Sequence, residues 1–150
     1  MQAEGTLVTR EVRIEASPET VFGFFVDPEL MMRWKGVEAD LEPIPGGRYR
    51  VNVTGHDIAV GEYVEVDPPR RVVFTWGWDG NEQVPPGSSV VEIDLAPDGD
   101  GTLVTLTHRG LPTGEGAGHA EGWEHYLARL AIAAKGGDPG PDPQVKEGAL

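Results

Sequence analysis

The sequence contains no cysteine. This absence excludes disulfide frameworks, thiolate catalysis and cysteine-ligated zinc sites, and it agrees with a reducing compartment. Basic residues are also scarce, with 12 Lys and Arg against 25 Asp and Glu, for a formal net charge of −13. A surface of that charge repels phosphate backbones and anionic lipids. We therefore expect no nucleic-acid partner.

Long apolar runs are missing as well. The N-terminus has neither the basic start nor the apolar stretch of a signal peptide. No segment reaches the roughly 20 apolar residues that a membrane-spanning helix needs. We expect no membrane insertion and a cytoplasmic location. The 150 residues suffice for one domain that needs no cofactor or metal to fold.

The N-terminal part of the sequence predicts one strand followed by two short helices. Residues 7–15 alternate apolar and polar side chains, as a half-buried strand does. Ser17 and Asp27 are N-cap residues, and each is followed by a proline at the first helical position. The second helix is predicted to run to Trp34.

The middle of the sequence predicts an antiparallel sheet, because Pro, Gly and Asp clusters separate runs of alternating apolar residues. The strands are expected at residues 48–54, 59–66, 71–78, 89–96 and 102–109, with a further short strand near 37–42. Period two assigns to one apolar face Tyr49, Val51, Val53, Glu62, Val64, Val66, Val72, Phe74, Trp76, Trp78, Val91, Ile93, Leu95, Val104, Leu106 and His108. Tyr63 falls on the opposite, mostly polar face.

Residues 117–135 predict a long amphipathic helix that ends at Gly136 and Gly137. Its apolar stripe carries His119, Trp123, Tyr126, Leu127, Leu130, Ala131 and Ala134. Residues 137–150 are rich in Gly and Pro and predict an extended tail, which leaves residues 1–136 as a single domain. A curved antiparallel sheet gripping one long helix, with two short helices after the first strand, is an α+β two-layer fold.

Five segments occur in one order along the chain: ASPETVFGFFVDPELMMRW, PGGRYR, GEYVEVDPPRRVVFTWGW, DGTLVTLTHRGLP and HAEGWEHYLARL. Over about residues 8–134 they resemble the activator-of-heat-shock-protein-ATPase branch of the START-like, SRPBCC superfamily. The resemblance implies a helix-grip fold with a pocket between the sheet and the long helix. Superfamily members hold lipids, sterols, polyketides or hormones, some are cyclases or hydrolases, and the eukaryotic namesakes stimulate a chaperone ATPase.

Three ionisable residues, His108, His119 and Glu62, are predicted to point into the space between sheet and helix. Because burying an unpaired polar group costs several kcal/mol, they must be hydrogen-bonded, paired or hydrated. Four interpretations stay open: structural hydrogen bonding, pocket lining, acid or base catalysis, and metal binding, although no short His-x-x-x-His spacing supports the last. His125 and Asp142 are expected to be solvated.

The aromatic lining favours a small hydrophobic or aromatic ligand. The predicted ligand-binding residues are Trp34, Tyr49, Phe74, Trp76, Trp78, His108, His119, Trp123, Tyr126 and Leu130. Each aromatic side chain among them has the alternative of packing only in the core. Further alternatives are a histidine-assisted cyclase, hydratase or hydrolase and a co-chaperone domain that stimulates a heat-shock ATPase. A homodimer remains open.

Overall fold

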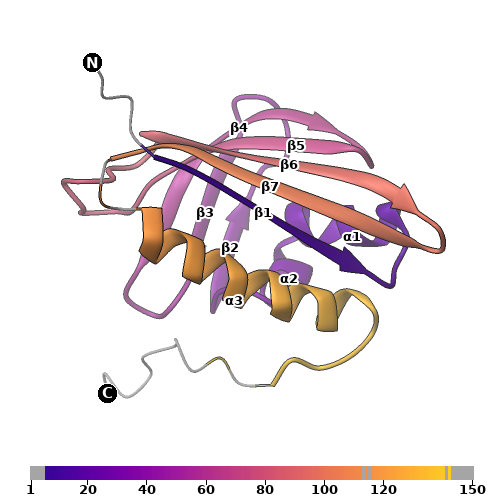
Figure 1. Ribbon diagram of the computed structural model, residues 1–150. Coiled ribbons are helices and arrows are strands. Elements are labelled where there is room, and N and C mark those ends of the chain that lie inside the picture. Colours follow the sequence, from indigo (N-terminus) through magenta and orange to yellow (C-terminus); the bar gives the residue numbers. More distant parts are fainter. Residues whose placement is uncertain (1–5, 113, 115, 141, 143–150) are drawn as a thin grey trace.

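A computed structural model describes residues 6–112, 114, 116–140 and 142 of the protein. The elements are β1 (Thr6–Ile14), α1 (Pro18–Val26), α2 (Pro28–Met31), β2 (Glu38–Leu41), β3 (Arg48–Asn52), β4 (Ile58–Asp67), β5 (Arg71–Trp76), β6 (Ser89–Asp98), β7 (Gly101–Leu111) and α3 (Gly116–Ala134). The strands form one antiparallel sheet in the order β1-β7-β6-β5-β4-β3-β2. Figure 1 shows this sheet arching over α3, with α1 and α2 on the same side. The predicted α+β helix-grip fold is confirmed.

The two predicted helix starts are confirmed by their caps. The Ser17 hydroxyl accepts a hydrogen bond from the Thr20 backbone N–H at 3.2 Å, and the Asp27 carboxylate accepts one from the Glu29 N–H at 2.9 Å. Helix α2 ends at Met31 and not at the predicted Trp34. The prediction ran too far because residues 33 and 34 donate to carbonyls three residues back, which tightens the chain into turns.

The predicted end of α3 is confirmed as well. Gly136 has φ +100°, and its N–H donates to the Ala133 carbonyl at 3.0 Å. The Gly137 N–H donates to the Ile132 carbonyl at 2.8 Å. These two bonds form a Schellman motif, whose left-handed position glycine adopts without strain.

Strand β4 departs from simple alternation, and this corrects the predicted orientation of Glu62. Tyr63 pairs with Phe74 of β5, but Glu65 pairs with the adjacent Val73, so β4 has one extra residue, Val64, at this point. Such a β-bulge reverses the side-chain phase before it. Glu62 is therefore exposed, while Tyr63 is buried and donates from its hydroxyl to the Phe25 carbonyl at 3.0 Å.

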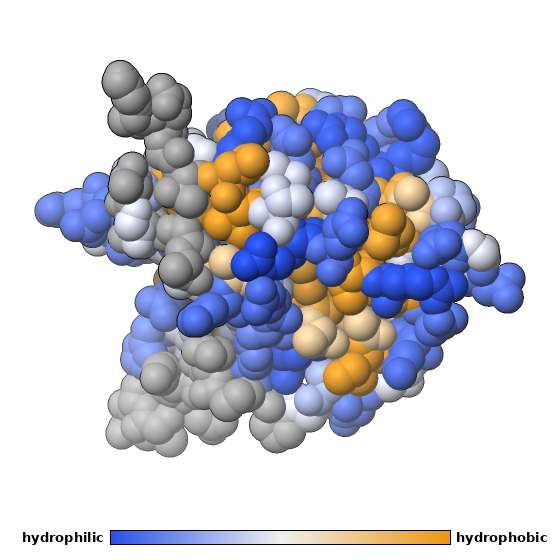
Figure 2. All heavy atoms as spheres, viewed as in Figure 1, coloured by the Kyte–Doolittle hydropathy of each residue, from blue (hydrophilic) through white to orange (hydrophobic). Residues whose placement is uncertain are grey.

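The other strands keep the predicted faces. The inward residues of β3, β5, β6 and β7 are buried and pack with α1 and the apolar stripe of α3. The outer face carries ion pairs such as Arg71 with Asp94, whose Nη1–Oδ1 distance is 2.8 Å. Figure 2 shows a mostly hydrophilic face with separate apolar patches. Of the helices in the described residues, none is long and apolar enough to cross a membrane.

Candidate functional site

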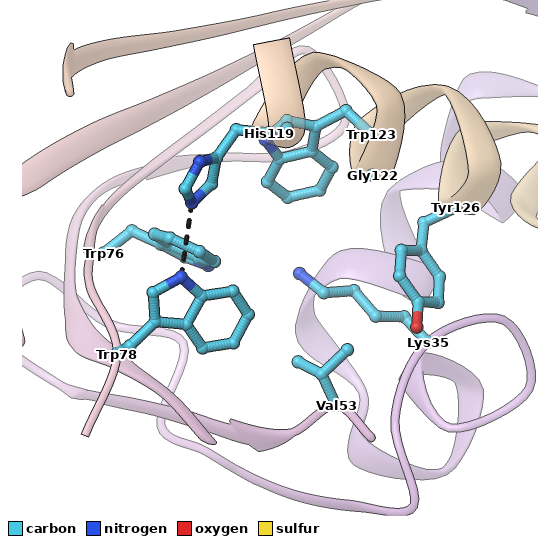
Figure 3. A pocket seen from close by; sticks show the side chains of 9 residues that line it. Lys35, Val53, Trp76, Trp78, His119, Gly122, Trp123 and Tyr126 are labelled. Carbon is cyan, nitrogen blue, oxygen red and sulfur yellow. Dashed lines mark hydrogen bonds between the residues drawn. The ribbon is translucent and has the colours of Figure 1, made fainter. Parts of the chain in front are cut away.

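A cavity of about 230 Å³ lies between the first half of α3 and the sheet. Its walls are Lys35, Val53, Trp76, Trp78, Gly118, His119, Gly122, Trp123 and Tyr126. Figure 3 shows Trp76 and Trp78 on one side, His119 and Trp123 reaching in from α3, and the Lys35 side chain ending in the space between them. The cavity is thus walled mainly by aromatic rings around one amine.

Helix α3 carries glycine at two positions that line the cavity. Gly118 and Gly122 are four residues apart and so lie on one helical face. A Cβ atom added at either position would meet no atom within 4 Å outside its chain neighbours and the adjacent backbone of α3. Each glycine costs the helix about 1 kcal/mol relative to alanine. Both glycines lie where α3 borders the unfilled volume. The sequence analysis missed this signal, which lies in the spacing of two glycines next to the apolar stripe.

His119, the first residue of that stripe, lines the cavity. The Trp78 Nε1–H donates to His119 Nε2 at 3.2 Å, which joins the segment that follows β5 to α3. The Trp76 ring packs edge-on to both, with centroid distances of 4.5 Å to Trp78 and 5.4 Å to His119. The structural and pocket-lining interpretations of His119 are therefore compatible, since one ring does both.

His108 lies behind this wall and has no solvent exposure. The Trp123 Nε1–H donates to His108 Nδ1 at 3.0 Å, and His108 Nε2 lies 2.8 Å from the Ser89 hydroxyl. The indole can only donate, so Nδ1 is the acceptor and neutral His108 carries its proton on Nε2. Ser89 in turn donates to the Trp76 carbonyl at 2.7 Å. Both ring nitrogens of His108 are thus engaged in the core.

The environment of His108 also disfavours its charged form. Burial, assisted by the nearby His119 and Lys35, lowers the pKa of His108 from 6.5 to about 3. The imidazole therefore stays neutral at physiological pH. This arrangement matches a satisfied core histidine, one of the four interpretations that the sequence left open.

Lys35 is the amine in the cavity wall, and the sequence analysis did not identify it. Its side chain is 4% exposed, and burial lowers its pKa from 10.5 to about 7. The amine donates to the Tyr49 hydroxyl at 3.3 Å and lies 4.3 Å from the centroid of the Trp123 ring. Lys35 follows a turn and precedes Gly36, outside any helix or strand. No periodicity assigns a face there, and buried lysine is rare.

Several predicted ligand-binding residues lie in the solid core and do not line the cavity. Trp34 donates from Nε1 to the Phe24 carbonyl at 3.0 Å, and Tyr49 stacks on Phe74 with a centroid distance of 4.2 Å. Leu130 is fully buried two turns beyond Trp123. Strand and helix phase distinguish inside from outside, but they do not show where the interior is hollow.

The geometry brings two of the three predicted ionisable residues together and excludes the third. The ring centroids of His108 and His119 are 5.6 Å apart, whereas Glu62 is exposed on the outer face. Among the residues that the structure describes, no three His, Cys, Asp or Glu side chains could hold a metal ion together. A metal or catalytic set of His108, His119 and Glu62 therefore lacks its carboxylate.

A tail contact corrects the expectation that His125 and Asp142 are solvated. The Asp142 side chain is 6% exposed, lies 2.8 Å from His125 Nε2, and accepts a hydrogen bond from the Tyr126 hydroxyl at 2.7 Å. Burial and this bond raise the pKa of Tyr126. Arg129 donates to the carbonyls of Trp34 and Gly140 at 3.1 and 2.9 Å. These contacts hold the start of the predicted tail on α3; residues 143–150 lie outside the described residues.

Comparison with known proteins agrees with this architecture. The family described as "Activator of Hsp90 ATPase homolog 1-like protein" matches residues 15–135. The chain belongs to this family. An AHSA1-like protein from Rhizobium etli, whose solution structure is known, is 56% identical over 92% of this chain and 87% of that chain, with a TM-score of 0.74.

Two other solved structures with the same fold are less similar in sequence to this AHSA1-like chain. CalU16 from Micromonospora echinospora is 26% identical, covers 90% of this chain and 88% of its own, and gives a TM-score of 0.68. The Aha1 dimer from Colwellia psychrerythraea is 19% identical over 88% and 98% of the two chains, with a TM-score of 0.75, and shows the fold alone. No curated protein matches the sequence.

Proposed function

We propose that this protein binds a small aromatic or hydrophobic molecule in the cavity between α3 and the sheet. The observation that carries the proposal is a space of about 230 Å³ that three indole rings and a phenol surround and no side chain fills. Ligand sites are concave and mainly apolar, with a few polar groups that orient the ligand. The cavity matches this description.

The walls support a flat ligand in particular. Aromatic rings prefer offset or edge-to-face contacts with other rings, worth about 0.5–1.5 kcal/mol beyond the area that they bury. The hydrogen bond between Trp78 and His119 holds two of these rings in place. A wall that is already rigid loses little conformational entropy when the ligand binds.

The tryptophans allow a direct test. Three of the four, Trp76, Trp78 and Trp123, line the cavity. We would screen lipids, flavonoids and aromatic polyketides by tryptophan fluorescence and thermal unfolding. A ligand at a hundred times its Kd should stabilise the protein by about 2.7 kcal/mol. Neither quenching nor stabilisation by any compound of the panel would contradict the proposal.

The alternative functions stay predictions. For histidine-assisted cyclase, hydratase or hydrolase chemistry, His119 is the imidazole in the cavity wall, whereas His108 has both nitrogens engaged. An enzyme of that kind should lose turnover in a His119→Gln variant with little change in melting temperature. Stimulation of a heat-shock ATPase would require direct binding of that ATPase, measurable with purified partners at low and high salt.

A further inference from the structure

The cavity wall carries an amine, Lys35, with no carboxylate beside it and an indole N–H, Trp76, with no acceptor among the residues that the structure describes. We propose that its ligand is an aromatic acid, whose anionic oxygen group pairs with Lys35 while its ring lies among the indoles. This inference rests on the proposed function, because it names the chemical class of the molecule that the same cavity would bind.

The first observation is that the described groups in contact with the Lys35 amine carry no negative charge. Its amine contacts the hydroxyl of Tyr49 and the ring face of Trp123, and both groups are uncharged. Among the described residues, no carboxylate lines the cavity; Asp57 and Glu121 line only the adjoining hollow. A buried charge without a counter-ion is costly, and an anionic ligand would provide that counter-ion.

The second observation concerns Trp76, which is 2% exposed and also forms part of the wall. Its buried Nε1–H finds no acceptor in the part of the chain that the structure describes. Figure 3 shows the indole nitrogen of Trp76 and the amine of Lys35 directed at the same space. Because neither group can accept a hydrogen bond when Lys35 is charged, both favour a ligand oxygen that accepts.

The overall charge of the protein does not oppose this local preference. A net charge of −13 disfavours anions at long range. At physiological ionic strength, however, that repulsion is screened beyond about 8 Å, whereas a contact with a buried amine is screened much less. The local amine therefore decides which charge the cavity accepts.

Other ionisable groups face this region from the elements packed around Lys35. Burial holds the pKa of Tyr49 on β3 and Tyr126 on α3 above their usual value, and holds that of His108 on β7 near 3. His119 on α3 and Asp57 before β4 also border this region. A pH dependence caused by Lys35 is recognised because a Lys35 variant removes it.

A matched ligand pair tests the inference. 2-Naphthoate and 2-naphthamide have nearly the same shape, but only the acid is anionic above about pH 5. We expect the wild-type protein to bind naphthoate at least tenfold more tightly than the amide at pH 6, measured by titration calorimetry. As Lys35 loses its proton above about pH 7, the Kd of naphthoate should rise about tenfold per pH unit, while that of the amide stays constant.

Variants assign the effect to Lys35. Lys35→Met should abolish the preference for naphthoate and its pH dependence but still bind the amide. Lys35→Gln, which keeps a neutral donor, should do the same and serves if the methionine variant does not fold. Lys135→Met, at the exposed residue that follows α3, is the matched control and should behave like wild type.

The outcomes separate the two proposals. If wild type binds amide and acid equally at pH 6, or if both Lys35 variants keep the preference for the acid, the inference is overturned and the proposed function stands. If neither compound nor any member of the wider panel binds, the proposed function fails and the inference fails with it.

Discussion

The indole N–H of Trp123 donates to Nδ1 of His108 across a distance of 3.0 Å. This bond connects α3 to β7, and together with the Ser89 contact it leaves His108 in one neutral tautomer. The same indole forms part of the cavity wall. The packing of the core and the shape of the cavity are therefore coupled through one side chain.

The depressed pKa of His108 predicts an acid-sensitive fold. The unfolded chain takes up this proton near pH 6.5, whereas the folded chain takes it up only near pH 3, so stability is lost as the pH falls through this window. We expect the free energy of unfolding to fall by about 2–3 kcal/mol from this residue between pH 7 and 4.5. Urea titrations at several pH values would give the free energy of unfolding of wild type and of His108→Gln. Plotted against pH, the wild-type free energy should fall more steeply between pH 7 and 4.5. Parallel pH curves for both proteins would refute the assignment.

The depressed pKa of Lys35 predicts that stability also changes with pH in the alkaline range, between about pH 7 and 10.5. Its folded-state pKa of about 7 lies below the unfolded value of 10.5, so the unfolded chain binds more protons between these values and stability rises with pH. Without ligand, Lys35→Met should be more stable than wild type at pH 7 by on the order of a few kcal/mol. The difference should shrink toward pH 10, as measured by chemical denaturation. A Lys35→Met protein that is less stable at every pH would show that the amine is not desolvated.

Gly122 predicts a variant that gains stability and loses binding. Outside its chain neighbours and its own helix backbone, a Cβ atom at this position meets no atom within 4 Å, so a leucine should extend into the unfilled space that Gly122 lines. It also removes a helix-interior glycine, so α3 should gain about 0.5–1 kcal/mol. Thermal unfolding should show the gain, and fluorescence titration with any ligand from the screen should show binding weakened at least tenfold. The control is Ala128→Leu on the exposed side of α3, which should leave binding unchanged.

The tail contact predicts a coupling between Tyr126 and Asp142. Hydrogen bonds to charged groups contribute about 1.5–3 kcal/mol, and the hydroxyl and carboxylate here are 2.7 Å apart. A double-mutant cycle with Tyr126→Phe and Asp142→Asn should therefore give a coupling energy above about 1 kcal/mol. The same cycle with Asp138→Asn, an exposed carboxylate in the same segment, should give a value near zero. Equal values in both cycles would mean that the tail does not depend on this bond.

Much of the fold could be predicted from the sequence because it depends on local chemistry. The N-caps at Ser17 and Asp27 and the glycine stop at Gly136 use hydrogen bonds within a few residues, and all are present. Strand faces follow from period two wherever pairing is regular. His119 and Trp123 meet the interior because the helical period places them on the stripe that packs against the sheet.

The tertiary structure alone decided the features that depend on distant partners. The bulge at Val64 is a property of how β4 pairs with β5, so period two misplaced Glu62 and Tyr63. Lys35 is buried because α3 and β3 close around a turn that has no periodicity of its own. Local sequence determines which side of an element is apolar, but the hollow and its charge arise only where several elements meet, and that depends on contacts far apart in the chain.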